Sequence, residues 1–149
     1  CVQFTGAPLN PPGSLSILDG TPHFGTTMTI GLHNPLDPPT QNPGTTLSFL
    51  FFTAAPPILS VPPHGGGLVS PVAGMDPLVG GEILINIIGA PPFLLGPVWN
   101  GSQVTIDLPI PNLPQFEGID FYLQGALYDT SGGPVELGMT EGFRITFLP

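Results

Sequence analysis

Ser102–Pro149 reads SQVTIDLPIPNLPQFEGIDFYLQGALYDTSGGPVELGMTEGFRITFLP, and this stretch decides the fold class. Apolar residues alternate with other residues in three parts of it, namely Val104, Ile106, Leu108 and Ile110, then Ile119, Phe121, Leu123 and Leu127, then Phe143, Ile145 and Phe147. A period of two places each apolar set on one face of a β-strand. We therefore expect a half-buried antiparallel sheet here, and the earlier chain has to supply the cover for its apolar face.

Shorter strand patterns lie before and between these three. They span residues 1–9, 14–18, 26–34, 45–55, 82–88 and 135–139. The run from Leu47 to Phe52 is apolar on both faces, which is typical of a central, well-covered strand. Loops rich in Pro and Gly are expected at 35–44, 62–81 and 89–101. About eight or nine strands punctuated by such turns predict an all-β fold, an antiparallel β-sandwich that is Ig-like or jelly-roll-like, in one domain over 1–149.

The composition supports a folded chain despite its content of helix breakers. The 149 residues include 22 Pro and 21 Gly, but 41% are hydrophobic and the mean hydropathy is +0.36. Disordered chains are poor in large apolar residues. Pro and Gly are therefore expected in the turns between short strands. No stretch of the sequence has the apolar pattern of a helix.

Charge is scarce, and nearly all of it is negative. Only 7% of the residues are charged, the single cation among Lys and Arg is Arg144, and the formal net charge is -9. Nucleic acids and anionic membranes both require clustered cations, so neither is an expected partner. The most apolar stretch, from Leu47 to Ile58, is broken by Pro56 and Pro57 and is too short to span a membrane.

No arrangement of residues indicates catalysis, and we expect the protein not to be an enzyme. His23, His33 and His64 lack the short spacings of zinc ligands. There is no Gly-x-Ser-x-Gly motif for a serine nucleophile. The carboxylates of Asp107, Asp120 and Glu117 are candidates by residue type alone. The alternation places Asp107 and Asp120 on the outer face, where they would be ordinary solvated acids.

Calcium is the alternative to having no cofactor. Asp129-Thr130-Ser131 and Asn34-Pro35-Leu36-Asp37 offer oxygen ligands in turns. The competing interpretation is that Asp129 and Asn34 stabilise those turns through hydrogen bonds to the backbone.

Aromatic side chains suggest a sugar ligand as a second alternative. The candidates for a platform on which a sugar ring stacks are Trp99, Tyr122 and Tyr128. The alternation along the strand places both tyrosines on its polar face. The triplet Asn100-Gly101-Ser102 also fits the N-glycosylation pattern.

Cys1 is the only cysteine, so an internal disulfide cannot form. Three readings stay open for it, namely attachment of a lipid, a cross-link between subunits, and an incidental residue.

Several runs of the sequence carry a family resemblance. They are Leu108-Pro109-Ile110-Pro111-Asn112, Phe121-Tyr122-Leu123-Gln124, Gly142-Phe143-Arg144-Ile145-Thr146, and, more weakly, Gly25–Thr29 and Gly65–Gly67. Together they resemble a C-terminal module of secreted proteins of planctomycetes and related environmental bacteria. The resemblance covers most of the chain, although only the last third is specific. It implies an exported β-sandwich without catalytic residues. Members carry a second Cys just after the Gly-rich loop, where this chain has Leu68.

The expected function is that of a non-catalytic extracellular structural protein, which assembles with copies of itself into a filament, sheath or surface layer. A chain this apolar, with no Lys to guard its sheet edges, is expected to expose interfaces. Residues 1–9, with Val2 and Phe4, form a candidate arm that adds as a strand to a neighbouring subunit. The alternative is a module on a secreted protein that binds a carbohydrate or another surface ligand.

Overall fold

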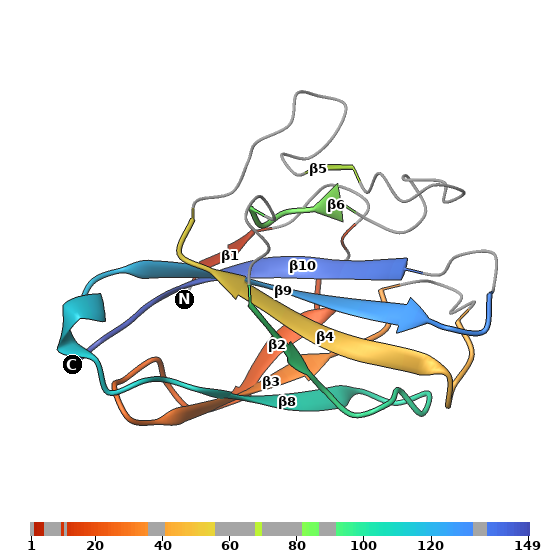
Figure 1. Cartoon of the computed structure of the whole chain (residues 1–149), viewed down its shortest axis with the longest axis horizontal. Helices are drawn as coiled ribbons and strands as arrows, with labels where there is room; N and C mark the ends of the chain where they lie inside the picture. The colour runs from red at the N-terminus through yellow and green to blue at the C-terminus, as the bar shows by residue number, and fades with distance from the viewer. Residues whose placement is uncertain are drawn as a thin grey trace.

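A computed structural model describes residues 2–4, 10, 12–35, 41–55, 68–69, 82–86, 92–132 and 137–149. Seven antiparallel strands form two packed sheets of four and three, and the short strand β1 (Val2–Phe4) extends the larger sheet to five (Figure 1). The antiparallel β-sandwich predicted from the alternation is therefore confirmed.

The larger sheet has the order β1-β10-β9-β4-β7. Its long strands are β10 (Leu137–Thr146), β9 (Asp120–Asp129) and β4 (Thr46–Thr53), and the short β7 (Phe93–Leu95) lies at the edge. The smaller sheet has the order β2-β3-β8, made of Leu15–Asp19, Thr27–Leu32 and Val104–Pro109. As predicted, β4 is an interior strand, paired with β9 on one side and β7 on the other.

The main core lies between these two sheets. Its buried members include Met28, Ile30, Leu32, Leu50, Val104, Ile106, Leu108, Ile110, Leu123, Leu127, Ile145 and Phe147. Most of the predicted apolar alternation is thus buried as expected. Ile119 is the exception, because it precedes β9 and keeps 37% of its surface exposed.

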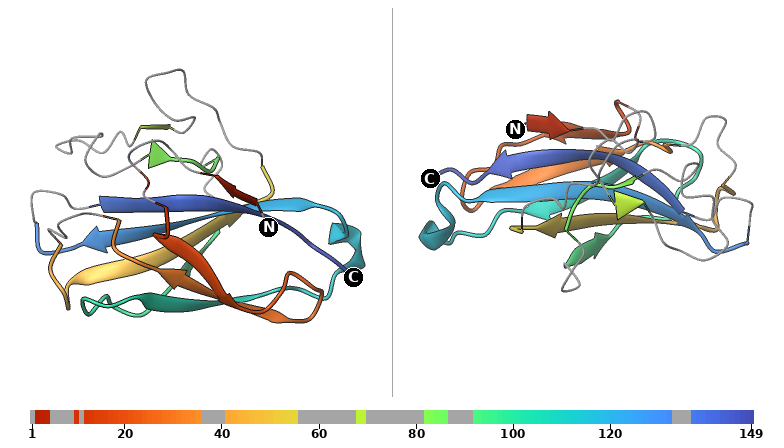
Figure 2. Two further views of the ribbon diagram at one scale, coloured as in Figure 1. Left: turned by 180° about the vertical axis from the view of Figure 1, so that it is seen from behind. Right: turned by 90° about the horizontal axis from the view of Figure 1, so that it is seen from above.

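A further segment covers the outer face of the larger sheet. Ile83, Leu84 and Ile85 are buried, and Ile83 and Ile85 pack with Ala126 of β9 and Met139 of β10. Figures 1 and 2 show β6 (Glu82–Ile83) on the side of the larger sheet that faces away from β3 and β8. The predicted polar face of β9 is therefore partly buried, and Gln124 is fully inaccessible.

Three predicted boundaries are corrected. The expected strand over 82–88 is shorter, since β6 pairs only with β5 (Leu68–Val69), which lies in a predicted loop. The predicted loop at 89–101 contains β7. Separate strands are expected at 135–139 and around Phe143, Ile145 and Phe147, but residues 137–146 form one strand, β10, with a register shift between Met139 and Gly142. A β-bulge lets a single strand continue past an interruption of the alternation, which explains the third difference.

Candidate functional site

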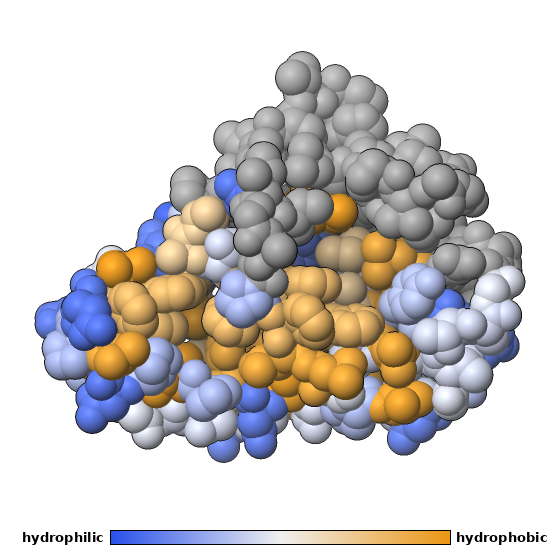
Figure 3. All heavy atoms as spheres, viewed as in Figure 1, coloured by the Kyte–Doolittle hydropathy of each residue, from blue (hydrophilic) through white to orange (hydrophobic). Residues whose placement is uncertain are grey.

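The edge of the larger sheet at β7 is apolar and exposed. Phe93 and Leu95 retain 53% and 63% of their surface, although they lie in a strand. The pairing with β4 places Phe93 opposite Phe51 and Leu95 opposite Phe49. The ring of Phe93 contacts those of Phe49 and Phe51 at centroid distances of 5.7 and 5.8 Å. We call Phe49, Phe51, Phe93 and Leu95 the β7 patch. Figure 3 shows an apolar band on this side of the molecule.

The opposite edge of the same sheet is formed by the N-terminal strand. β1 pairs antiparallel with β10 through Val2–Arg144, Gln3–Phe143 and Phe4–Gly142. The backbone of residues 2–4 of the predicted arm is therefore in a sheet, whereas Cys1 and residues 5–9 lie outside the described residues. The next described residue after β1 is Asn10, whose side-chain amide donates to the carbonyl of Thr140 at 2.7 Å.

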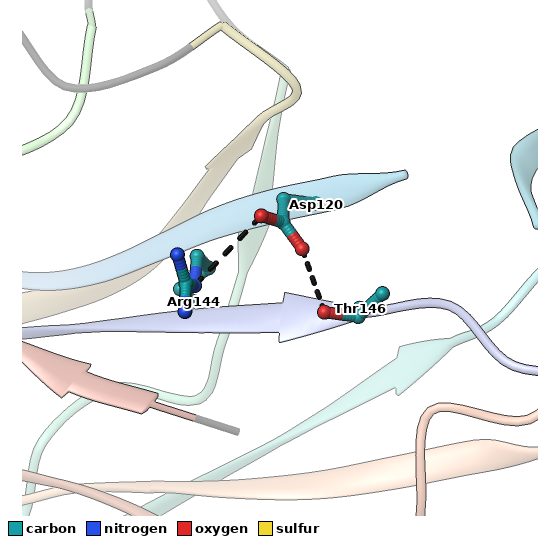
Figure 4. A network of polar contacts seen from close by, with 3 residues as sticks. All are labelled: Asp120, Arg144 and Thr146. Carbon is teal, nitrogen blue, oxygen red and sulfur yellow. Dashed lines mark hydrogen bonds and ion pairs between the residues drawn. The ribbon is translucent and has the colours of Figure 1, made fainter. Parts of the chain in front are cut away.

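The single cation of the chain lies beside this edge. Arg144 Nε is 3.8 Å from Asp120 Oδ2, and the hydroxyl of Thr146 donates to Asp120 Oδ1 at 2.6 Å (Figure 4). The Arg144 and Asp120 side chains are 43% and 36% exposed, so solvent screens this ion pair and its contribution to stability is small. Asp120 lies at the surface, as the alternation predicted.

A buried polar cluster forms at the bulge of β10. Glu141 is inaccessible to solvent, and its Oε1 accepts hydrogen bonds from the backbone N–H groups of Gly13 at 2.7 Å and Leu15 at 3.3 Å. Its own N–H donates to the hydroxyl of Ser14 at 2.9 Å. Buried polar groups require such partners. The carboxylate therefore joins the start of β2 to β10, which links the two sheets.

Gln124 extends this cluster to the outer cover. Its side-chain amide donates to the carbonyl of Thr140 at 2.8 Å, and its oxygen accepts from the N–H of Leu84 at 2.8 Å. The hydroxyl of Thr140 accepts from the N–H of Gly125 at 2.8 Å. These bonds satisfy backbone groups at the bulge and also hold the covering segment on the sheet.

Asp129 is the second inaccessible carboxylate, and it organises the turn after β9. Its oxygens accept from the backbone N–H groups of Asn42 (2.8 Å) and Ser131 (2.9 Å) and from the hydroxyls of Thr45 (2.8 Å) and Ser131 (2.7 Å). Burial raises the pKa of this carboxyl, but the hydrogen bonds from Ser131, Asn42 and Thr45 outweigh it and hold the pKa well below its usual range.

The hydrogen bonds of Asp129 argue against a calcium ion at this side chain. The oxygens of Asp129 face N–H and O–H donors, whereas a calcium ion is surrounded by oxygen ligands without intervening donors. The predicted hydrogen bond from Asp129 to its turn is present at Ser131. Asn34 donates to the side-chain oxygen of Gln41 at 3.1 Å, and Asp37 lies outside the described residues. Within the described ranges, no three His, Cys, Asp or Glu side chains come together as metal ligands would.

An apolar pocket of about 210 Å³ opens at the end of the sandwich that carries the 3-10 turn Pro114–Phe116. We call it the end pocket. It is lined by Phe52, Leu108, Pro109, Pro111, Phe116, Phe121, Leu123, Ile145 and Phe147. The rings of Phe121 and Phe147 stack at 4.3 Å, and Phe116 contacts Phe121 edge-on at 5.7 Å. All nine described lining residues are apolar, so an occupant would meet almost only hydrocarbon there.

The aromatic candidates for a sugar platform do not lie together. Trp99 is only 4% exposed and belongs to the main core, so its assignment to an exposed platform is wrong. Tyr122 packs against the cluster on the outer face, and Tyr128 is 37% exposed near the other end of β9. The two tyrosines are six positions apart on one strand, which separates them by about 20 Å.

The remaining polar candidates are scattered. His33 is exposed, as expected, and His23 contacts the hydroxyl of Thr21 at 2.7 Å. Asp107 accepts from the hydroxyl of Thr29 at 3.0 Å, and Glu117 is exposed in a turn. The exposed Asn100 accepts from the N–H of Ser102 at 3.0 Å. His64 lies outside the described residues. No helix in the described part of the chain is long and apolar enough to cross a membrane.

Sequence reasoning missed the β7 patch, the end pocket and the roles of Glu141 and Gln124. One local signal was present for Glu141, because Thr140 and Glu141 interrupt an otherwise apolar strand pattern between Met139 and Phe143. For the other features the partners lie far apart in the chain. No protein-family model matches this sequence, and no curated protein or solved structure matches it either.

Proposed function

We propose that this chain is a non-catalytic extracellular structural subunit that assembles with copies of itself into a filament, sheath or surface layer. The observation that carries the proposal is the larger sheet, whose two edges are short strands of very different kinds. One edge is the N-terminal strand β1, and the other is the exposed apolar strand β7.

Strand exchange at β10 is the proposed assembly step. β1 contributes three residues to the sheet and is joined to the body through residues 5–9. The same backbone pairing to Arg144, Phe143 and Gly142 can be made by the arm of a neighbouring subunit, so exchange keeps the pairing while joining two chains. Because donor and acceptor are different surfaces, the contact is head-to-tail and can propagate into a filament.

The β7 patch supports the same proposal from the other edge. Soluble monomers guard exposed edge strands with Lys, other charges or bulges. No charged residue lies between Glu82 and Asp107, the part of the sequence that contains β7. The edge strand therefore has no charged side chain of its own or close to it in the sequence. Burial of Phe93 and Leu95 against another subunit would remove their apolar surface from water, which stabilises association.

The low content of cations fits an extracellular material. Arg144 is the only site in the chain at which a trypsin-like protease could cut, because there is no Lys. Its pairing within β10, between β1 and β9, further shields the adjacent peptide bond.

Electron microscopy of the purified chain, together with size-exclusion chromatography, tests the proposal. We expect ordered fibres or sheets from the full chain and none from a variant that lacks residues 1–9. Assembly that survives the deletion would exclude exchange of this arm and leave the β7 patch as the contact. A full chain that stays monomeric near 15.5 kDa at high concentration would overturn the proposed function itself.

A further inference from the structure

The end pocket is apolar, and it plays no part in the proposed contacts between subunits. Its floor is formed by Leu108 of β8, Leu123 of β9 and Ile145 of β10, all buried side chains of the main core. Phe116, Phe121 and Phe147 form one wall. Pro109 and Pro111 also line the pocket and are exposed, so they mark its rim. The pocket is thus open on one side and continuous with the hydrophobic core.

Polar occupants are disfavoured by this lining. A buried water needs partners for two to four hydrogen bonds, and a sugar needs partners for each buried hydroxyl. The residues around the pocket offer aliphatic and aromatic carbon. Desolvation of a polar ligand would therefore go uncompensated, whereas a hydrocarbon would gain dispersion contacts with the residues that line the pocket.

The walls are held by strand pairing and ring stacking. The pairing of Ile145 with Phe121 fixes β10 against β9, and the stacked rings of Phe121 and Phe147 brace the same end. Phe116 is held by the 3-10 turn, where its N–H donates to the carbonyl of Leu113 at 2.9 Å. These restraints oppose collapse of the pocket, as expected of a preformed ligand site.

We propose that the end pocket binds a small hydrophobic molecule built on a single six-membered ring, such as an alkylbenzene. An apolar cavity of about 150 Å³ lined by Leu, Ile and Phe is large enough to bind benzene. At about 210 Å³ the end pocket has room for such a ring with a short alkyl substituent. The edges and faces of Phe116, Phe121 and Phe147 would contact the ring in the geometries that aromatic pairs prefer.

Titration of the monomeric chain with toluene tests this inference, with ¹³C-labelled methyl groups observed by NMR. We expect saturable shifts at Leu108, Leu123 and Ile145, and no comparable shifts at Leu15 and Leu32, which lie in the same core but do not line the pocket. Glucose serves as the polar control and should leave all these methyl groups unchanged. A variant lacking residues 1–9 can replace the full chain if the latter polymerises, because none of the described residues that line the pocket belongs to that segment.

A filling variant provides a second readout. Leu108→Phe places a ring in the pocket and should weaken toluene binding by about tenfold or more. Ile106→Phe is the matched control, because Ile106 points inward from the same strand without lining the pocket. If Leu108→Phe fails to fold, the shifts measured in the unmodified chain still decide the question.

Three results would overturn the inference. The first is the absence of shifts, and the second is shifts that grow without saturation at all core methyl groups. The third is tighter binding of hexane than of toluene, which would assign the pocket to alkyl chains instead of rings. None of these results depends on whether the subunit assembles.

Discussion

Solvent does not reach the side chains of Asp129 and Glu141, and each accepts hydrogen bonds from backbone N–H groups. An ionised group is costly to bury unless hydrogen bonds replace its hydration. The donors to Asp129 come from two separate parts of the chain, the turn that contains Asn42 and Thr45 and the turn that contains Ser131. Each of the two side chains thus joins segments that lie far apart in the sequence, which is a structural reason for burying an acid.

The lowered pKa of Asp129 predicts a specific dependence of stability on pH. In the unfolded chain an Asp titrates near pH 3.9. The contribution of Asp129 is therefore complete above that pH and is lost as the pH falls towards the lower folded pKa. We expect Asp129→Asn to be less stable than the wild type at pH 7, with the difference narrowing at pH 3. Urea unfolding of both proteins at pH 7 and pH 3 measures this difference in the free energy of unfolding.

Asp107→Asn is the control for this prediction, because Asp107 is exposed and accepts from one hydroxyl. It should change stability little at either pH. A stability difference for Asp129→Asn that is constant from pH 7 to pH 3 would contradict the assignment of the acid sensitivity to this carboxylate.

Glu141→Ala is expected to lower the free energy of unfolding by about 2–4 kcal/mol, since it leaves the N–H groups of Gly13 and Leu15 without their acceptor. Glu117→Ala, on an exposed turn, should change it by less than about 0.5 kcal/mol. Chemical denaturation of both variants provides the comparison. If Glu141→Ala and Glu117→Ala lower the free energy of unfolding equally, the hydrogen bonds of Glu141 do not stabilise the contact between β2 and β10.

At the scale of elements, the larger sheet combines long interior strands with short edges. β9 and β10 each contain ten residues, whereas β1 and β7 each contain three. Fewer backbone hydrogen bonds hold a short edge strand, so it opens more readily than the interior. Gly125 of β9 shows how tightly the interior is packed, because an added Cβ would lie 2.7 Å from Leu32 Cδ2 across the core.

The pairing of β1 with β10 predicts how trypsin acts on the chain. Cleavage can occur only after Arg144, which lies opposite Val2. Deletion of residues 1–9 should speed cleavage under native conditions by about tenfold or more, because it turns β10 into an edge strand that opens locally. Mass spectrometry detects the loss of residues 145–149. Unfolded chains of both kinds should be cut at the same rate, and equal native rates would show that β1 does not protect this bond.

At the scale of the whole molecule, the balance between apolar surface and charge governs association. A single charged side chain at the β7 patch should therefore have a large effect. We expect Leu95→Lys to raise the critical concentration for assembly by about tenfold or more, because it places an uncompensated charge at a contact surface. Light scattering over a concentration series measures this threshold.

Thr105→Lys is the matched control, since Thr105 is exposed on the outer face of β8 and the substitution changes the net charge equally. If both variants change the threshold by the same factor, the effect does not depend on where the charge is placed, and the β7 patch is not a contact.

Several features of the site could not have been predicted, for identifiable reasons. The alternation around Gln124 indicates an outer face but not that Ile83, Leu84 and Ile85 cover it. Trp99 follows a run rich in Pro and Gly that suggests a loop, yet its N–H donates to Thr46 and its ring enters the core. The strand β7 has only three residues between Pro-containing turns, and pairing with β4 is what makes it a strand.

The sequence by itself determined the all-β class, the inward faces of β8 and β10, the interior position of β4 and the scarcity of charge. These follow from residue type and from a period of two, which are properties of neighbouring residues. Tertiary structure alone decided the outer cover, the donors to Asp129 and Glu141, the exposed β7 patch and the end pocket. Each of these depends on which distant segments pack together, because the burial of a side chain is settled by its neighbours in space and not by its neighbours along the chain.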